Sequence, residues 1–99
     1  MPTSKRLRIS YSAKRDLVRI GDYTRREWGT SQKLKYLGEI REKLGALADT
    51  PGIGAPRDDI DEGLRALPAR RHIIFYRETE NDVVIVRVLH ESMNPDLHL

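Results

Sequence analysis

Residues 71–90 constrain the fold more than any other stretch, because two runs rich in β-branched and aromatic residues flank the four polar residues 79–82. Asn81 and Asp82 tolerate turn dihedrals and hydrogen-bond to their own backbone. The pattern predicts a β-hairpin with a two-residue loop at Glu80 and Asn81. One face is then almost wholly apolar and suited to cap a core. The facing pairs on it are Ile73 with Val88, Phe75 with Val86, and Arg77 with Val84.

The other face of the hairpin is unusual for a sheet that meets water. An antiparallel sheet with one solvated side alternates apolar and polar residues, whereas this side combines aliphatic residues with a tyrosine and an arginine. We expect it to be covered, either by another polypeptide or by the chain's own tail or residues 51–62. Its members are Ile74, Tyr76, Val83, Ile85, Arg87 and Leu89.

The length of the chain suits a single domain spanning residues 1–99. A chain of this size buries only about 60–70% of its unfolded surface and cannot form two cores. It has no cysteine, which excludes disulfides and thiolate metal sites and fits a reducing compartment. No apolar run approaches the roughly 20 residues of a membrane span, and the N-terminus lacks the apolar stretch of a signal peptide. We expect a soluble cytoplasmic protein without a membrane partner.

Positive charge is concentrated in the N-terminal half of the chain. Residues 1–49 hold 12 Lys/Arg against 6 Asp/Glu, residues 50–69 hold 2 against 4, and residues 70–99 hold 4 against 5. The basic excess suits an acidic partner, either protein or nucleic acid. A solvated, lysine-rich helix surface explains it equally well.

Two amphipathic helices are predicted to follow a first strand at residues 7–11, where apolar and polar residues alternate. Ser12 is expected to cap a helix that ends at Gly29, and Thr30 or Ser31 to cap a second helix. Asp16 would lie in the first turns, where it favours the helix dipole. The apolar stripes are Ala13, Leu17, Ile20, Thr24 and Trp28 in the first helix, and Leu34, Leu37, Ile40, Leu44 and Leu47 in the second.

The remaining segments complete an α+β fold. Pro51 ends the second helix, an irregular segment runs to residue 62, and Pro68 confines the short strand at residues 63–68 to a sheet edge. The element order is therefore β-α-α-β-β-β. We expect two layers, with the helical hairpin packed on one face of a four-stranded antiparallel sheet of strand order 1-4-3-2. The opposite face is expected to stay open.

Few residues point to catalysis. The chain has no Gly-rich phosphate loop, no His-Glu-x-x-His and no Gly-x-Ser-x-Gly motif, and we expect neither a metal nor a cofactor. The hairpin does gather a cluster at its open end: Arg70, Arg71, His72, His90 and Glu91. Metal-independent RNA cleavage needs a base, an acid and fixed cations, for which Arg71, Arg87 and His90 are the candidates. Alternatively, the cluster only fringes the sheet.

Several sequence blocks are typical of one known family. They are Ala13-Lys14-Arg15-Asp16-Leu17, Asp22-Tyr23 to Trp28-Gly29, Pro51 to Ile60, Gly63-Leu64-Arg65, Arg71-His72-Ile73-Ile74-Phe75-Tyr76-Arg77, and Arg87-Val88-Leu89-His90. Together they resemble the ParE toxins of bacterial toxin–antitoxin pairs, within the RelE/ParE superfamily. The resemblance covers nearly the full chain and implies the same β-α-α-β-β-β fold.

The resemblance also implies a function. It implies a type II toxin that poisons DNA gyrase by binding, without an enzymatic reaction and without sequence-specific nucleic-acid binding of its own. A cognate ParD-like antitoxin would neutralise it. The first alternative is a ribosome-dependent messenger RNA endoribonuclease of the RelE type, although the chain lacks the terminal tyrosine of that group. The second alternative is a non-toxic binding module.

The resemblance suggests where such partners bind. Antitoxins of this family thread a segment around the toxin, and its apolar anchors and acidic residues require an apolar groove with arginines. The second face of the hairpin fits that description. The expected antitoxin contacts are Arg65, Ile74, Tyr76, Ile85, Arg87 and Leu89, and the target-binding candidates are Arg70, Arg71, His90 and Met93.

Overall fold

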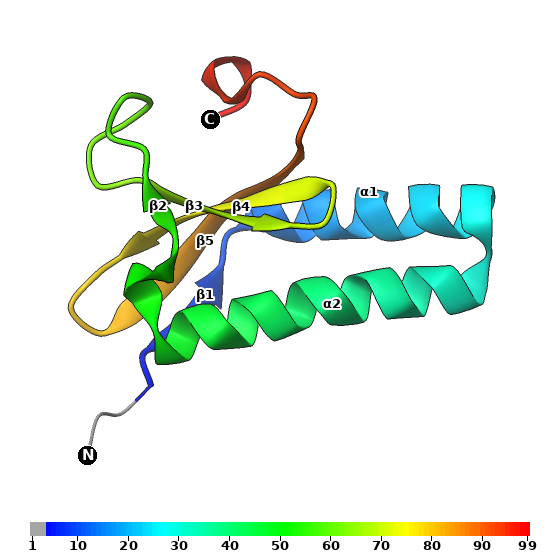
Figure 1. Cartoon of the computed structure of the whole chain (residues 1–99), viewed down its shortest axis with the longest axis horizontal. Helices are drawn as coiled ribbons and strands as arrows, with labels where there is room; N and C mark the ends of the chain where they lie inside the picture. Colours follow the sequence, from blue (N-terminus) through cyan, green and yellow to red (C-terminus); the bar gives the residue numbers. More distant parts are fainter. Residues whose placement is uncertain (1–3) are drawn as a thin grey trace.

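The computed structural model describes residues 4–99, which fold into two layers (Figure 1). A hairpin of two helices covers one face of a five-stranded sheet, and the C-terminal segment lies on the opposite side (Figure 1). The predicted α+β architecture is confirmed. The elements are β1 (Arg6–Ile9), α1 (Tyr11–Trp28), α2 (Thr30–Asp49), η1 (Pro51–Ile53), β2 (Ala55–Pro56), β3 (Arg65–Ala69), β4 (His72–Glu78), β5 (Asp82–His90) and η2 (Pro95–Leu97).

The sheet contains one strand more than predicted and one parallel pair. Its order, β1-β5-β4-β3-β2, confirms the predicted strand order and adds β2 at the edge. The prediction that the strand with Pro68 is the edge strand is therefore wrong, although β2 pairs only with Arg65 and Ala66 of that strand. The prediction of a wholly antiparallel sheet is wrong, because β1 pairs with β5 in parallel. The first strand after the helices does run opposite to β1, but that strand is β2, which has only two residues and no period-two pattern. The turn after β2 reverses the chain again, so β3 runs parallel to β1.

The β4–β5 hairpin keeps the predicted register near its loop and loses it further along. Thr79 N donates to Asp82 O at 2.8 Å, which closes the two-residue loop, and Arg77 lies opposite Val84 as predicted. A β-bulge at Val86 then shifts the pairing by one residue. The pairs predicted as Ile73–Val88 and Phe75–Val86 are wrong, and the observed pairs are Ile73–Leu89, Ile74–Val88 and Phe75–Arg87.

The hairpin face that was predicted to stay open lies beneath the helices. The side chains of Ile74, Tyr76 and Ile85 are 0% exposed and belong to the core between sheet and helices. The prediction that they form an open surface is therefore wrong. Beyond the bulge the facing of β5 reverses, so Val88 joins this core, whereas Leu89 is buried on the other side.

The other face of the sheet carries a second, smaller apolar cluster. Residues 57–64 and the C-terminal segment lie over this face (Figure 1), so the chain covers it itself. Within residues 4–99, this apolar cluster is therefore covered at least in part by the chain itself. It consists of buried Leu64, Ala66, Phe75 and Leu89, with Ile60, Ile73, Val86 and Met93 packed against them.

Helix α1 begins earlier than predicted. Its N-cap is Ser10, not Ser12: Ser10 Oγ accepts a hydrogen bond from Ala13 N at 3.0 Å. The same hydroxyl donates to Val86 O at 2.8 Å, so the cap also fixes the start of α1 to the bulge in β5. Gly29, with φ of 93°, ends α1 as predicted.

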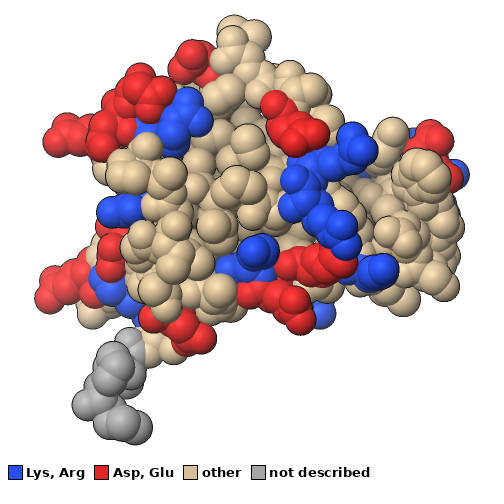
Figure 2. Space-filling model, in the orientation of Figure 1, with Lys and Arg blue, Asp and Glu red and all other residues tan. Residues whose placement is uncertain are grey.

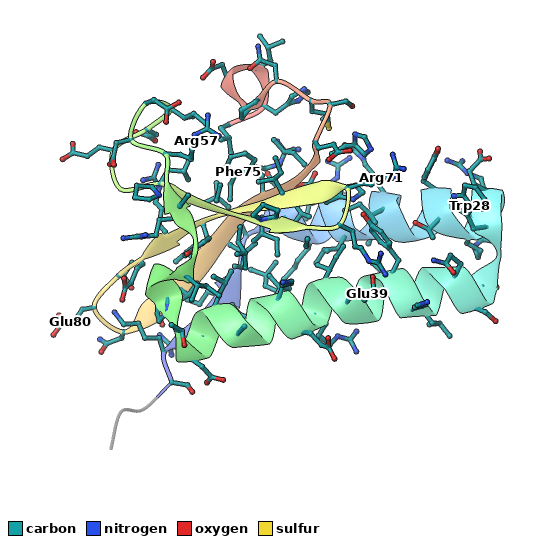
Figure 3. All side chains as sticks on the ribbon, in the orientation of Figure 1. Trp28, Glu39, Arg57, Arg71, Phe75 and Glu80 are labelled. Atoms are coloured by element: carbon teal, nitrogen blue, oxygen red, sulfur yellow. The ribbon has the colours of Figure 1, made fainter. Side chains whose placement is uncertain are left out.

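The two helices extend beyond the edge of the sheet (Figure 1). The predicted apolar stripes are buried only where the sheet lies beneath them. At the tip of the hairpin, where Figure 3 labels Trp28, that side chain is 72% exposed. Leu34 is 66% exposed, so the prediction of both as core residues is wrong. Within residues 4–99, neither helix combines the length and the apolar character needed to cross a membrane.

Asp16 joins helix and sheet through a buried ion pair, a role different from the predicted contact with the helix dipole. It is 6% exposed. Its carboxylate accepts Arg87 Nε at 2.7 Å, Arg87 Nη2 at 2.8 Å and Val88 N at 2.9 Å. Arg87 Nη1 donates to His98 O at 2.6 Å. The hydrogen bonds that Arg87 donates to Asp16 raise the pKa of Arg87. The Asp16 carboxylate thus anchors α1 to β5, and the Arg87 guanidinium anchors the C-terminal segment.

The connection between α2 and β3 is fixed by the Tyr76 hydroxyl. That hydroxyl donates to Pro51 O at 2.6 Å and accepts from Gly54 N at 2.8 Å, and burial raises its pKa. A Cβ atom at Gly54 would overlap the ring and hydroxyl of Tyr76, so only glycine permits this approach. Ile60 packs on the outer cluster and holds the rest of the connection.

Asp16→Ala is expected to lower the free energy of unfolding by about 3 kcal/mol, the lower end of the range for broken buried pairs, because it leaves the partly buried guanidinium of Arg87 without its counter-charge. Urea denaturation followed by circular dichroism measures the loss. Asp22→Ala is the matched control: Asp22 is exposed on the same helix, and its loss should stay within about 0.5 kcal/mol. Equal losses in the two variants would contradict an anchoring role for the ion pair.

Candidate functional site

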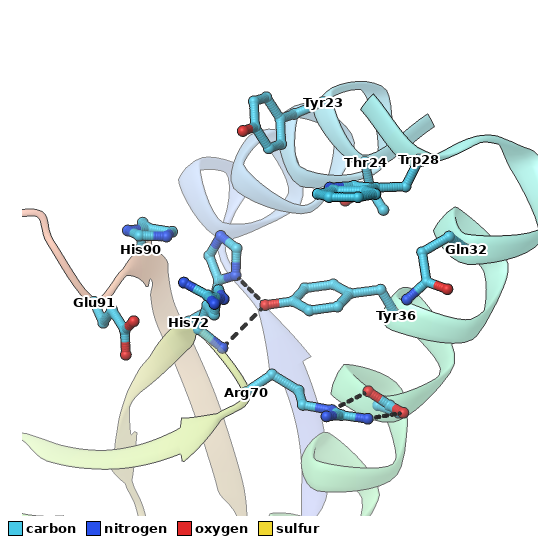
Figure 4. A pocket seen from close by; sticks show the side chains of 11 residues that line it. Tyr23, Thr24, Trp28, Gln32, Tyr36, Arg70, His72, His90 and Glu91 are labelled. Atoms are coloured by element: carbon cyan, nitrogen blue, oxygen red, sulfur yellow. Dashed lines mark hydrogen bonds and ion pairs between the residues drawn. The ribbon is translucent and has the colours of Figure 1, made fainter. Parts of the chain in front are cut away.

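A groove of about 1040 Å³ lies between the helical hairpin and the β3–β4 turn. Figure 4 shows the side chains that line it. Both helices contribute aromatic residues, and the sheet contributes cationic and imidazole side chains. The lining residues are Tyr23, Thr24 and Trp28 of α1, Gln32, Tyr36 and Glu39 of α2, and Arg70, Arg71, His72, His90 and Glu91 of the sheet.

Tyr36 and His72 both line the groove and contact each other there. The Tyr36 hydroxyl lies 2.6 Å from His72 Nδ1 and accepts Arg71 N at 3.2 Å. The hydroxyl can donate its own proton to Nδ1 of a neutral His72 imidazole, whose proton then lies on Nε2. Burial, with a smaller effect from His90, lowers the pKa of His72 to about 4. Burial also raises the pKa of Tyr36.

The two arginines of the β3–β4 turn have different roles. Arg70 adopts the left-handed φ of 59° that a two-residue turn requires. Its guanidinium holds the Glu39 carboxylate through two bonds of 2.7 and 2.9 Å, and this bond lowers the pKa of Glu39. Arg71 is exposed, and among residues 4–99 no carboxylate pairs with its guanidinium. Arg71 is therefore the cation that remains available to a ligand.

His90 lies at the end of the groove beside His72. The two imidazole rings meet edge to face at 5.2 Å. His90 Nδ1 accepts Ser92 N at 3.1 Å and lies 2.7 Å from Ser92 Oγ, so its Nε2 is the nitrogen left for a ligand. Glu91 N donates to Arg71 O at 2.8 Å, which joins the end of β5 to the turn.

The structure brings together three of the four predicted target-binding residues. Arg70, Arg71 and His90 line the groove, whereas Met93 packs on the outer face of the sheet. Of the set considered for RNA cleavage, Arg71 and His90 are in the groove, but Arg87 is occupied by Asp16 and His98. The fold does not assemble that set at one open site.

The predicted antitoxin contacts do not form an exposed surface. Ile74, Tyr76 and Ile85 are 0% exposed and Leu89 is 2% exposed, so none of these four side chains is accessible to a partner. Arg65 is half-buried, with Nη1 donating to Gly54 O at 2.6 Å. Ile74, Tyr76 and Ile85 share a face as predicted, but the helices cover that face; the bulge accounts only for Leu89, which it moves to the opposite side.

Sequence reasoning missed the aromatic side of the groove. Tyr36 lies on α2 between the apolar stripe and the polar face, and Trp28 was assigned to the stripe of α1. Their approach to Arg71 depends on how the helical hairpin sits on the sheet. An aromatic residue beyond the end of the buried stripe was the one available signal, since a core helix rarely exposes tryptophan.

A second, smaller groove lies on the helical hairpin, away from the first. It measures about 240 Å³. Val18 lines it and is 63% exposed. Leu34 is not a lining residue, but it is 66% exposed and lies in the sequence between the lining residues Lys33 and Leu37. Its lining is mostly apolar, with one acidic and one basic residue: Leu17, Val18, Gly21, Asp22, Lys33 and Leu37. Within residues 4–99, no group of three or more side chains is placed to hold a metal ion.

Comparison with known proteins identifies similar chains over nearly the whole length. A family described as "ParE toxin of type II toxin-antitoxin system, parDE" matches residues 7–95. Toxin ParE1 of Caulobacter vibrioides is 38% identical over 95 residues, which cover 96% of this chain and 98% of that protein. Toxin ParE1 of Mycobacterium tuberculosis is 39% identical over 97 residues, covering 97% and 99%. The solved chromosomal ParDE system of P. aeruginosa matches with a TM-score of 0.78 at 24% identity, covering 88% and 96%, and shares the fold.

Acidification is expected to destabilise the protein partly through His72. The pKa of His72 is lowered from 6.5 to about 4 on folding, so the unfolded chain binds the proton more readily between these values. Stability should therefore fall as the pH decreases from about 6.5 to about 4, as urea midpoints would show. His72→Gln should flatten this dependence, while His98→Gln, at an exposed histidine, should not. The same slope in both variants would contradict a buried neutral imidazole.

Proposed function

Because the chain belongs to the ParE toxins of type II toxin–antitoxin systems, we propose that it inhibits DNA gyrase by binding and is held inactive by a cognate antitoxin. The family resemblance supplies the target, and the groove supplies a surface suited to it. Tryptophan, tyrosine and arginine are the residues that most often dominate binding energy at interfaces, and all three line this groove. This proposal places the action in the cytoplasm, where gyrase works on DNA.

Binding fits the groove better than RNA cleavage does. Cleavage needs a base, an acid and fixed cations converging on one phosphate. His72 Nδ1 is engaged by Tyr36, and Arg87 is held by Asp16 outside the groove. Arg71 and His90 alone would have to supply every role. The occupation of Arg87 is the observation that most favours a binding toxin over the RelE-type alternative.

The groove on the helical hairpin is the proposed antitoxin site, in place of the buried sheet face. The two helices carry nine Lys/Arg and six Asp/Glu. Two of the acidic residues, Asp16 and Glu39, are neutralised by Arg87 and Arg70 of the sheet, so the helical surface is strongly basic. An acidic amphipathic helix with apolar anchors over Val18 and Leu34 would match both its charge and its exposed apolar side chains.

The first test concerns the target. Inducing the chain alone should cause DNA breaks and the SOS response before translation stops, and the purified protein should inhibit gyrase supercoiling. Arg71→Gln should raise the concentration for half-inhibition roughly tenfold, as loss of a central charged contact does. Arg41→Gln is the control, because Arg41 is exposed on α2 and does not line the groove.

Two outcomes would contradict this proposal in different ways. Translation arrest that precedes DNA damage, with cut messages, would identify the RelE-type ribonuclease. Normal colony counts after induction of stable, folded protein would identify a non-toxic binding module.

The second test concerns the antitoxin. The double substitution Val18→Glu with Leu34→Glu should weaken antitoxin binding at least tenfold, because it places negative charge where acidic and apolar side chains are expected to dock. Toxicity without antitoxin should persist. Leu97→Glu is the control, since Leu97 is 78% exposed but lies in η2 of the C-terminal tail. Unchanged neutralisation of the double variant in titrations with purified antitoxin would place the antitoxin elsewhere.

A further inference from the structure

The aromatic side chains of the groove are placed for stacking on a flat ring. Figure 4 shows Trp28 and Tyr36 on facing sides of the groove, with Gln32 beside Tyr36 and Tyr23 above. Trp28 is 72% exposed and Tyr23 is 57% exposed, although both are large enough to stabilise a core. Among residues 4–99, neither ring belongs to the core between sheet and helices or to the apolar cluster on the other face of the sheet.

The Tyr36 ring is held in position before any ligand arrives. Its hydroxyl is bonded to His72 Nδ1 at 2.6 Å and to Arg71 N at 3.2 Å. The ring also meets His72 edge to face at 5.5 Å. With its polar atom already engaged, Tyr36 offers a ligand only the face of its ring.

Positive charge lies next to the aromatic rings. Figure 2 shows Lys and Arg side chains gathered between the sheet and the largely uncharged tip of the helical hairpin. Arg70 and Glu39 neutralise one another. Arg71 pairs with no carboxylate of residues 4–99, and Nε2 of His90 is a further donor. Glu91 on the rim is the opposing charge. A ligand that carries both a flat ring and an anionic group suits this combination better than an acidic peptide, because carboxylate side chains do not stack on the aromatic rings.

We propose that the groove binds a nucleotide unit of single-stranded nucleic acid, with its base between Trp28 and Tyr36 and a phosphate at Arg71 and His90. Gln32 can donate to and accept from a base edge, which tolerates different bases. Stacking on aromatic rings beside a cationic groove is how single strands are bound without sequence preference. The volume of about 1040 Å³ lies at the upper end of small-molecule sites, which span about 300–1,000 Å³, and favours a strand over a free nucleotide. The site goes beyond the proposed gyrase contact.

The experiment uses the full chain and its one tryptophan. Because Trp28 lines the groove, its fluorescence should be quenched by a thymidine oligonucleotide of about 12 residues, within the usual range of about 4–16 nucleotides per single-strand site. An abasic oligomer of equal length should bind at least tenfold more weakly, because it retains the phosphates and loses the bases. Affinity should fall as salt rises. A poly-glutamate peptide should not quench the signal.

Variants separate the two parts of the site. By anisotropy of a labelled oligonucleotide, Trp28→Ala and Arg71→Gln should each weaken binding about tenfold, the former by lost stacking and the latter by lost charge. Tyr11→Ala and Arg41→Gln are the matched controls, because both residues are exposed outside the groove, and they should bind as the parent does. If thymidine monophosphate bound as tightly as the oligomer, the base would still bind between Trp28 and Tyr36, but the ligand would be a free nucleotide and not a single strand.

The proposal would be overturned by equal binding of the abasic and base-containing oligomers, by normal binding of Trp28→Ala, or by preferential binding of poly-glutamate. These measurements contain no gyrase. Loss of gyrase inhibition with intact oligonucleotide binding would therefore refute the proposed target alone, and the reverse result would refute the nucleotide site alone.

Discussion

The buried carboxylate of Asp16 is the contact on which the arrangement of the two layers depends. It holds both Arg87 and the Val88 amide, directly beyond the bulge at Val86. Because a buried charge is tolerated only when its partners are satisfied, these bonds favour the observed position of helix α1 on β5. Arg87 then reaches His98 O, which brings the C-terminal tail over the outer face. Helix, bulge and tail are thus set by one ion pair.

This anchoring places the helical hairpin so that its far end overhangs the sheet. Apolar residues along the covered part become core, whereas Trp28 and Leu34 beyond it remain exposed. The overhang creates the groove, because α1 and α2 face the β3–β4 turn across open space. The pairing of Arg70 with Glu39 fixes the turn and leaves Arg71 as the local cation. The same geometry that stabilises the fold therefore also forms the groove.

The two grooves of this type II toxin differ in position and in lining. The larger lies between the helical hairpin and the β3–β4 turn and combines aromatic rings with Arg71, whereas the smaller lies on the helices and is mostly apolar within a basic surface. An antitoxin docked in the smaller groove would leave the larger one to be blocked by size or by a further segment of its chain. Toxicity and neutralisation would then be separable by substitution.

Local sequence determined the secondary structure of this protein. The polar residues 79–82 fixed the hairpin loop, Gly29 fixed the break between the helices, and apolar spacing fixed which helix faces meet the sheet, because each depends on contacts within a few residues. Strand order and the family resemblance also followed from sequence. Tertiary structure alone decided the bulge at Val86, the strand at Ala55–Pro56 and the burial of Asp16. Each arises from partners far apart in the chain. The one-residue shift moved only the end of β5 to the other side, and the packing of the helices decided which face of the hairpin lies in the core.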